Sequence, residues 1–280
     1  MSEHNMQRLS DFKVLTFDCY GTLIDWEAGI WDAFQPVISS NGRSDILRKD
    51  ALEAFAVIES RLEAETPGMP YLEVLEQVHV AFARRFGLLT TAGLNSGFAD
   101  SLPNWPAFAD TADALRYLKT RYKLVILSNV SRDGFAASNR KLGVEFDAVF
   151  TAQDIGSYKP APANFEYLLE HLHRDHGLQQ KEILHTAQSL FHDHLPAKSF
   201  GLATAWIDRQ QLSKSDDWGA TARLDELPTT DFQFHSMGEM AAAAGTGLRY
   251  IFTQNIFCFR GYQGQVMLGS FNTLLRYMTF

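Results

Sequence analysis

The stretch 14–23, Val-Leu-Thr-Phe-Asp-Cys-Tyr-Gly-Thr-Leu, constrains the fold of this 280-residue chain more than any other. Residues 13–17 form a short apolar run of strand-forming residues, and turn-forming residues follow at once. The pattern predicts a buried strand that ends at Asp18. In an open α/β sheet, ligands bind beyond the carboxyl ends of the strands. We therefore expect Asp18 in a crevice, where its carboxylate can act as a nucleophile, a base or a metal ligand.

The rest of the chain predicts an α/β fold with an insertion. Strand-like runs at 123–127, 148–150, 183–186 and 203–207 alternate with helical patterns, which indicates a doubly wound parallel sheet of Rossmann-like type. Residues 26–108 show apolar residues at helical spacing and no clear strand. One such stripe holds Leu72, Leu75, Val78, Phe82 and Phe86, with Gly87 as its C-cap.

These patterns predict three parts. A catalytic core comprises residues 9–25 and 109–240, and a helical cap, residues 26–108, is inserted after the first strand. An atypical C-terminal tail follows at 241–280. Residues 245–280 contain no Asp, Glu or Lys and are rich in aromatic residues. They indicate either a partner- or membrane-facing appendage or a poorly specified tail outside the natural domain, and we favour the second.

Composition excludes several classes of protein. The net charge of −8 disfavours a nucleic-acid partner, because phosphate binding needs a basic face. No apolar run is long enough to span a bilayer, and residues 1–12 contain no apolar signal core. Two cysteines, Cys19 and Cys258, favour a reducing compartment, so we expect a cytoplasmic protein. Cys19 is interpreted as a small core residue rather than a reactive thiol.

Three further features follow strand ends or lie in loops beside them: Ser128-Asn129, Lys159 and Asp193. Asp18 is the only carboxylate at the end of the first strand, which makes it the candidate nucleophile. Lys159 would hold Asp18 ionised and offset charge in the transition state. The Ser128 hydroxyl can bind a substrate oxygen, and Asp193 can position water or Lys159. Taken singly, Lys159 and Asp193 are better explained as solvated surface charges, but the joint pattern argues against this.

The order and spacing of these features resemble the four motifs of the haloacid dehalogenase-like hydrolase superfamily. The motifs stand here as Asp18-Cys19-Tyr20-Gly21-Thr22, Ser128-Asn129, Lys159-Pro160 and the segment 185–193. The resemblance covers roughly residues 10–240. It implies that Asp18, Lys159 and Asp193 are catalytic. It also implies substrate binding by Tyr20, Thr22, Ser128 and Asn129.

Tyr20 indicates the branch of the superfamily. Phosphatases of this superfamily generally carry a second Asp at that place, which protonates the leaving alkoxide. A halide needs no proton, and a tyrosine, with an unperturbed pKa of about 10, cannot replace that carboxyl. The L-2-haloacid dehalogenase branch likewise has an aromatic residue there. Gln188 stands where magnesium-dependent members usually present an acid. Asp18 and Asp193 alone are a thin set for Mg²⁺, so the resemblance implies no metal and no cofactor, with Mg²⁺ as the alternative.

The substrate grip departs from that branch. Its members share a cap arginine that holds the substrate carboxylate or halide, whereas this chain offers Glu59, Arg61 and Glu63. Glu59 and Glu63, four residues apart, share a helix face and would repel an anion if they faced the site. Arg61 lies on another face. Phe165 stands where that branch has a tyrosine. His192 is a candidate water-activating base, although a capping or packing role is commoner.

The sequence thus predicts a hydrolase of 2-haloacid dehalogenase type that acts on a small molecule through an Asp18 nucleophile and a covalent ester. The alternatives are a Mg²⁺-dependent phosphatase, a related hydrolase of a non-halogenated metabolite, and a non-catalytic scaffold. A membrane partner is not expected, and a homodimer is one alternative for the oligomeric state.

Overall fold

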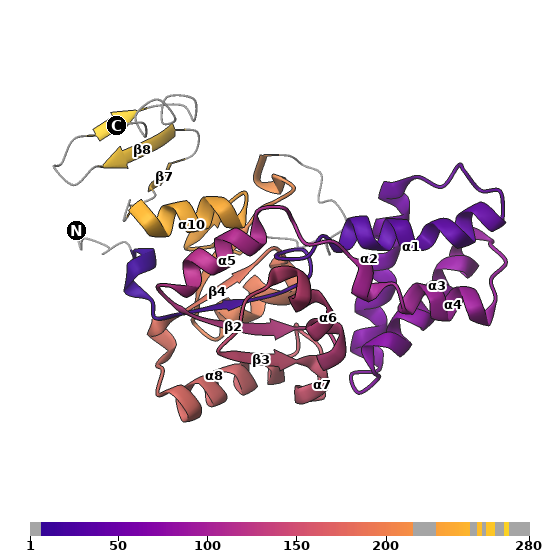
Figure 1. Ribbon diagram of the computed structural model, residues 1–280, viewed down its shortest axis with the longest axis horizontal. Helices are drawn as coiled ribbons and strands as arrows, with labels where there is room; N and C mark the ends of the chain where they lie inside the picture. The colour runs from indigo at the N-terminus through magenta and orange to yellow at the C-terminus, as the bar shows by residue number, and fades with distance from the viewer. Residues whose placement is uncertain (1–6, 215–227, 247–250, 254–255, 261–265, 269–280) are drawn as a thin grey trace.

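A computed structural model describes residues 7–214, 228–246, 251–253, 256–260 and 266–268. At its centre lies a six-stranded parallel sheet with the strand order β3-β2-β1-β4-β5-β6 (Figure 1). The order confirms the predicted doubly wound fold, because β1 is central and the chain crosses over to both sides of it. The strands are β1 (Val14–Phe17), β2 (Lys123–Ser128), β3 (Ala148–Thr151), β4 (Ile183–Ala187), β5 (Ala203–Ile207) and β6 (Phe232–Phe234).

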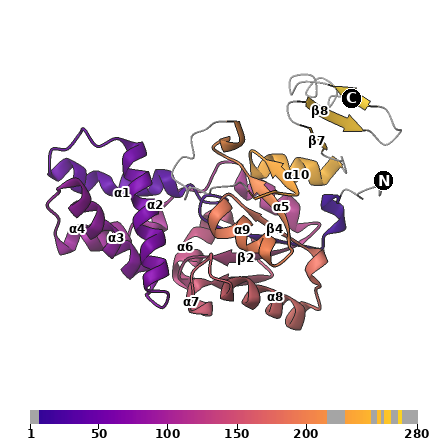
Figure 2. The same cartoon turned by 180° about the vertical axis from the view of Figure 1, so that it is seen from behind.

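Alternate residues of the central strands supply two separate cores, since successive side chains of a strand point to opposite faces of the sheet. One face packs on α5 (Thr111–Lys119), α6 (Arg132–Leu142) and α10 (Met237–Thr246), and it includes Leu15, Leu124, Ile126 and Leu184. The other face packs on α8 (Ala163–His176) and α9 (Leu195–Ser199), and it includes Val14, Val125, Leu127 and Ile183. Figures 1 and 2 show α10 and α5 on one side of the sheet and α8 on the other. The short helix α7 (Ala152–Ile155) follows β3.

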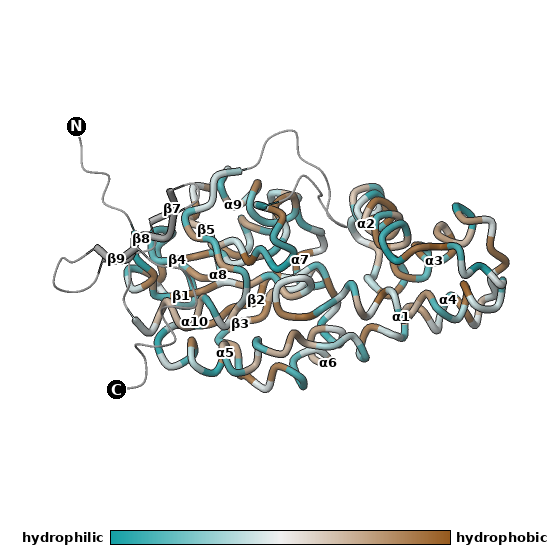
Figure 3. The backbone as a smooth tube through the Cα atoms, turned by 90° about the horizontal axis from the view of Figure 1, so that it is seen from above, coloured by the Kyte–Doolittle hydropathy of each residue, from teal (hydrophilic) through white to brown (hydrophobic). Residues whose placement is uncertain are grey.

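Four helices between β1 and α5 lie beside the sheet rather than on either face, as Figure 3 shows from above. They are α1 (Trp26–Ser40), α2 (Arg48–Glu65), α3 (Tyr71–Phe86) and α4 (Ala92–Ala99), and we refer to them as the cap helices. Their centre is aromatic: the Phe34 ring stacks on Phe82 at a centroid distance of 3.7 Å and on Phe98 at 4.6 Å. The division of the chain at residues 26 and 108 stays a prediction.

The chain enters and leaves the cap helices through two segments that pair with each other. Ile24 forms an antiparallel bridge with Ala107. The backbone N–H of Asp25 donates to the Pro106 carbonyl at 2.8 Å, and that of Phe108 donates to the Leu23 carbonyl at 3.2 Å. The segments that enter and leave the cap helices are therefore hydrogen-bonded to each other, beyond the carboxyl end of β1.

Most predicted elements are present, with small shifts at their ends. Gly87 closes α3 in the left-handed conformation, with a φ of 66°. The apolar stripe on α3 begins one residue earlier than expected, because Tyr71 is buried whereas Leu72 is 42% exposed. Helix α10 crosses the predicted boundary at residue 240, and its Met240 and Ala244 belong to the main core.

Most of the predicted tail lies outside the described residues, and Cys258 is described only as part of a strand backbone. Its described backbone forms a three-stranded antiparallel sheet of β7 (Ile251–Thr253), β8 (Ile256–Arg260) and β9 (Val266–Leu268). Within the described residues, no helix combines the length and apolar character that a membrane crossing requires.

Candidate active site

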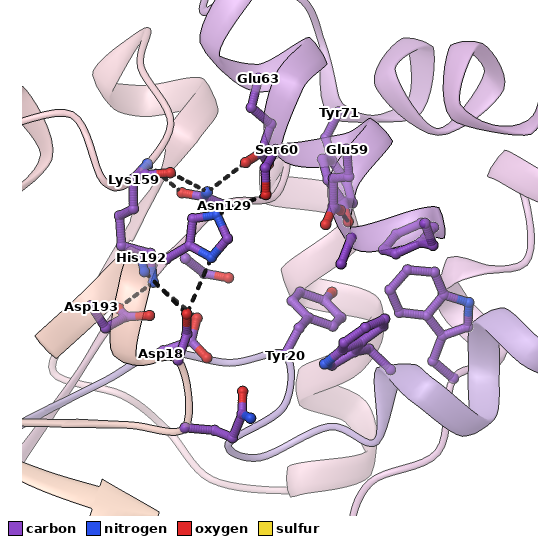
Figure 4. A pocket seen from close by; sticks show the side chains of 17 residues that line it. Asp18, Tyr20, Glu59, Ser60, Glu63, Tyr71, Asn129, Lys159, His192 and Asp193 are labelled. Carbon is purple, nitrogen blue, oxygen red and sulfur yellow. Dashed lines mark hydrogen bonds and ion pairs between the residues drawn. The ribbon is translucent and has the colours of Figure 1, made fainter. Parts of the chain in front are cut away.

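Three charged side chains meet at the carboxyl ends of the strands. Asp18 directly follows β1, whose last residue is level with Ile126 of β2 and Thr186 of β4. Lys159 Nζ lies 2.9 Å from Asp18 Oδ1 and 2.6 Å from Asp193 Oδ1 (Figure 4). It also donates to the Leu127 carbonyl at 3.1 Å. The three predicted catalytic residues are therefore brought together, and all three donors of the ammonium group are engaged.

The ion pairs set the charge of this cluster. Burial alone would lower the pKa of Lys159, but the carboxylates of Asp18 and Asp193 outweigh it and raise that pKa above its ordinary value. Burial likewise opposes ionisation of Asp193, yet Lys159 and His185 hold its pKa well below the usual range. Burial raises the pKa of Asp18, and its contact with Lys159 opposes that rise. A charged lysine thus faces two carboxylates in a water-poor site.

The turn after β1 orients the candidate nucleophile. Thr22 Oγ1 donates to Asp18 Oδ2 at 2.9 Å and accepts from the Gln188 backbone N–H at 2.9 Å. Gly21 has a φ of 96°, and a Cβ there would lie 3.0 Å from Gln188 Oε1 and 3.1 Å from Trp26 Nε1. Thr22 is fully buried and is not among the residues that line the pocket. We therefore propose that it positions Asp18, in place of the predicted substrate contact.

Tyr20 does line the pocket, but its hydroxyl is turned away from the charged cluster. The hydroxyl lies 2.9 Å from Ser138 Oγ on α6, and the ring packs edge-on against Trp105 at a centroid distance of 5.5 Å. Burial raises the pKa of Tyr20 well above its ordinary value, so the phenol stays neutral. The residue two places after Asp18 thus presents a neutral aromatic ring in place of a carboxyl, and its hydroxyl is engaged by Ser138.

The end of β2 contributes one free and one fully engaged polar side chain. Ser128 Oγ is buried, lines the pocket and has no hydrogen-bond partner among the described residues. Asn129 Oδ1 accepts from the Lys159 backbone N–H at 2.7 Å, and its Nδ2 donates to the Lys159 carbonyl at 3.0 Å. The same Nδ2 donates to Glu63 Oε2 at 3.1 Å. Asn129 therefore fixes the lysine loop and links it to the cap helices.

Helix α2 forms the wall opposite Asp18. Its pocket-facing residues recur at helical spacing, and they are Phe55, Ala56, Glu59, Ser60 and Glu63. Figure 4 shows Glu59 and Glu63 reaching into the pocket from this helix. Tyr71 donates its hydroxyl to Glu59 Oε1 at 2.6 Å. Arg61 is exposed and does not line the pocket, so the shared face predicted for the two glutamates is the face that meets the site.

These glutamates are easier to protonate than surface carboxyls. Burial raises the pKa of Glu59 to about 7, with the Tyr71 hydrogen bond opposing the rise and the charge of Asp18 adding to it. Burial also raises the pKa of Glu63 well above its ordinary value, and the nearby Glu59 adds to this. The pocket therefore places four carboxyls, Asp18, Glu59, Glu63 and Asp193, around one space.

The histidines have different positions. His192 lines the pocket, with Nε2 at 3.3 Å from Ser60 Oγ and Nδ1 at 3.1 Å from Ser189 Oγ, and burial lowers its pKa to about 4. It stands in a π-helical turn, Leu190–His194, with Asp193. His185 lies behind the pocket, where its Nε2 is 3.0 Å from Asp193 Oδ1. Sequence reasoning missed this orienting role of His185.

Several other residues complete the wall or support it. The aromatic side of the pocket consists of Trp26, Phe55, Tyr71 and Trp105, none of which was predicted as a site residue. Cys19 is buried in the main core, and burial raises the pKa of its thiol well above the usual value, as expected for an unreactive residue. Phe165 packs edge-on against His185 in the second core and does not line the pocket.

Known proteins are similar to this chain in sequence and in fold. A family model described as haloacid dehalogenase-like hydrolase matches residues 12–186. An (S)-2-haloacid dehalogenase from Pseudomonas sp. (strain YL) is 27% identical over 220 residues, which span 75% of this chain and 90% of that protein. The protein is therefore a hydrolase by family, and the chain belongs to the haloacid dehalogenase-like hydrolases.

Two solved structures show how widely the fold is shared. The L-2-haloacid dehalogenase from Xanthobacter autotrophicus with chloropropionic acid covalently bound has a TM-score of 0.67 and 18% identity, covering 84% of this chain and 98% of that one. A putative HAD-hydrolase from Bacillus subtilis bound to magnesium has a TM-score of 0.65 and 19% identity, covering 85% and 100%. Both similarities concern the fold alone. The choice between a metal-independent dehalogenase and a magnesium-dependent hydrolase must therefore be argued from the side chains of the pocket.

Proposed function

We propose that the protein hydrolyses a carbon–halogen bond of a small organic molecule, with Asp18 as the nucleophile. The observation that carries this proposal is the buried contact of 2.9 Å between Asp18 Oδ1 and Lys159 Nζ, beside a neutral Tyr20. A charged lysine keeps the carboxylate available for attack. Tyr20, whose hydroxyl lies 2.9 Å from Ser138 Oγ, takes the place of the second Asp that would protonate an alkoxide leaving group.

The first step is a displacement at carbon. A carboxylate oxygen of Asp18 forms a bond to the substrate carbon, and the carbon–halogen bond breaks with its electron pair leaving on the halide. The product of this step is an ester on Asp18. The charge of Lys159 stays close throughout and offsets the charge that develops as the halide departs.

The second step is hydrolysis of that ester. Water attacks the carboxyl carbon of Asp18, and the bond between that carbon and the ester oxygen breaks. One proton of the water leaves with the alcohol product, and the other is released as Asp18 returns to its carboxylate form. Asp193 Oδ2 is buried, belongs to a residue that lines the pocket and has no hydrogen-bond partner among the described residues. It is available to accept a hydrogen bond from the attacking water and to orient it.

The donor set does not fit a magnesium site. Asp18 Oδ1 and Oδ2 are engaged by Lys159 and Thr22, and Asp193 Oδ1 is engaged by Lys159 and His185. The resemblance leads us to expect an acid at the place of Tyr20 in a phosphatase and at the place of Gln188 in a magnesium-dependent member. Within the described residues, no group of three acidic, histidine or cysteine side chains is arranged to hold a metal ion. We propose that the reaction proceeds without a metal cofactor.

A single-turnover experiment in H₂¹⁸O tests the proposal. Racemic 2-chloropropionate and 2-chloropropionamide are each mixed with excess enzyme in the presence of EDTA. We expect halide release, unlabelled oxygen in the first product, and ¹⁸O in the Asp18 peptide. Absence of halide release from both compounds, or undiminished release by the Asp18→Asn variant, would refute the assignment. An Asp18 adduct would also dismiss the non-catalytic scaffold.

A further inference from the structure

Helix α2 presents two carboxyls to the space in which a substrate must lie. Glu59 and Glu63 are separated by one helical turn and both line the pocket that contains Asp18. Each uses one oxygen within the protein, since Glu59 Oε1 accepts from Tyr71 and Glu63 Oε2 accepts from Asn129. The second oxygen of each carboxyl has no hydrogen-bond partner among the described residues, so it can accept a hydrogen bond from a ligand.

No cation in the pocket is free to bind an anionic substrate. Of the 17 lining residues, all in the described part of the chain, Lys159 is the only lysine or arginine. Its three donors already contact Asp18, Asp193 and the Leu127 carbonyl. His192 also lines the pocket, but burial lowers its pKa to about 4, so it is neutral at pH 7.

A second, independent feature points to a ligand. Ser128 lines the pocket, and only 2% of the residue is exposed. Its Oγ lacks a hydrogen-bond partner among the described residues. A buried hydroxyl without a partner costs free energy until something pairs with it. The pocket therefore offers one hydroxyl donor and two carboxyl acceptors around the reactive aspartate.

We propose that Glu59 and Glu63 select a non-anionic substrate whose reactive carbon carries a primary carboxamide, and that they reject the corresponding carboxylate. A primary amide has one carbonyl acceptor and two N–H donors, which match Ser128 on one side and the two glutamates on the other. A carboxylate in the same place has no donor and would face like charges, which disfavours binding. This inference rests on the proposed function, because it names the substrate class for the same reaction at Asp18.

The reaction balances with water alone. The 2-haloamide and water give the 2-hydroxyamide, a halide ion and a proton, with Asp18 regenerated in the second step. The amide bond itself is untouched. A class of reaction that forms or releases 2-halogenated amides would have to supply the substrate.

Binding of unreactive analogues tests the selection without any chemistry. Propionamide and propionate have the same shape and no leaving group, and their dissociation constants can be measured by NMR titration at pH 8. We expect wild-type protein to bind propionamide at least about tenfold more tightly, because like charges repel propionate. Propionate binding as tightly as propionamide, or more tightly, would overturn the inference.

Variants assign the effect to the two glutamates. We expect Glu59→Gln to raise propionate affinity by about fivefold or more while changing propionamide affinity less, since Glu59, with a pKa of about 7, is ionised at pH 8 and the substitution removes a like charge. Glu63→Gln should raise propionate affinity less, because burial raises the pKa of Glu63 well above its ordinary value. Glu65→Gln is the matched control, because Glu65 is exposed at the end of the same helix, and it should leave both constants unchanged. If Glu63→Gln does not fold, the wild-type comparison and Glu59→Gln still decide. An unchanged ratio in Glu59→Gln would contradict the assignment.

The two proposals fail separately. Chloride release from 2-chloropropionate with propionate bound preferentially would refute the amide selection and leave the Asp18 chemistry standing. Preferential binding of propionamide without chloride release from either chloro compound would support the selection and refute the dehalogenation.

Discussion

The ammonium group of Lys159 lies 2.9 Å from Asp18 Oδ1, and both side chains are almost completely buried. Asp18 comes from the end of β1 and Lys159 from the loop before α8, 141 residues later. The contact forms because parallel strands bring their carboxyl ends to one edge of the sheet. Lys159 is thus the main group that favours the charged form of Asp18 against the effect of burial.

Loss of Lys159 should damage both activity and stability. We expect Lys159→Met to reduce the rate of halide release by about 10³-fold, since it removes the positive charge that offsets negative charge in the transition state. The free energy of unfolding should fall by about 3 kcal/mol, because Asp18 and Asp193 are left as unpaired buried charges. Denaturant titration measures this loss. Adding Asp18→Asn to the variant should recover part of the stability, and no recovery would contradict the ion-pair argument.

Replacement of Asp193 should separate the two chemical steps. Asn can still accept a hydrogen bond from Lys159 at Oδ1, but it replaces the free Oδ2 with an amide donor. We expect Asp193→Asn to form the ester and hydrolyse it about 10²-fold more slowly. Mass spectrometry of the Asp18 peptide during turnover should show the accumulated adduct. A comparable loss of rate with no adduct would place Asp193 in the first step instead.

Metal removal should leave the reaction unchanged. Both oxygens of Asp18 are engaged, by Lys159 and Thr22, and within the described residues no three acidic, histidine or cysteine side chains are arranged to hold a metal ion. We expect dialysis against EDTA to change the rate of halide release by less than about twofold, because the side chains of the site are not arranged to hold a hard cation. Recovery of lost activity by added Mg²⁺ would contradict the proposal. Turnover of p-nitrophenyl phosphate that EDTA abolishes would favour the phosphatase alternative.

Glu59 should make stability depend on pH near neutrality. Its pKa is raised from 4.5 to about 7, chiefly by burial, with Tyr71, Asp18 and Glu63 nearby. A folded-state pKa above the unfolded value means that protonated Glu59 favours folding, and this contribution is lost as pH rises from about 4.5 to 7.

The Glu59→Gln variant, which retains an oxygen acceptor for Tyr71, should therefore gain stability over wild type as pH rises. We expect a gain on the order of 2 kcal/mol at pH 8 compared with low pH, since one pKa unit corresponds to about 1.4 kcal/mol. Urea unfolding at pH 5 and pH 8 measures it, with Glu65→Gln as the exposed control. A difference that does not change with pH would show that Glu59 is not protonated near neutrality.

Sequence reasoning succeeded where local pattern and topology agree. The central strands are short apolar runs with clear turn signals, and parallel topology then requires Asp18, Ser128 and Lys159 to share one edge of the sheet. The strand β6 was missed because three residues, Phe232–Phe234, carry too short an alternation to be distinguished from a loop.

The pocket wall could be predicted only in part. The i, i+4 spacing placed Glu59 and Glu63 on one face of α2, but nothing in the sequence says which face meets the core. Trp26 and Trp105 line the site from the two ends of the inserted segment, and the packing that brings them together is long-range. The resemblance implies that Thr22 binds substrate, and a hydroxyl in a turn gives no sign of which way it points, so its hydrogen bond to Asp18 could not be predicted.

The paired crossings at Ile24 and Ala107 have a consequence for how this protein could diversify. Because the two ends of the inserted segment are hydrogen-bonded neighbours, a segment of another length or sequence could replace it without stretching the sheet. The reactive aspartate and its lysine lie outside that segment, whereas both glutamates lie inside it. Recombination at this junction would replace the whole segment and with it the substrate preference, while the residues that carry out the reaction would stay the same.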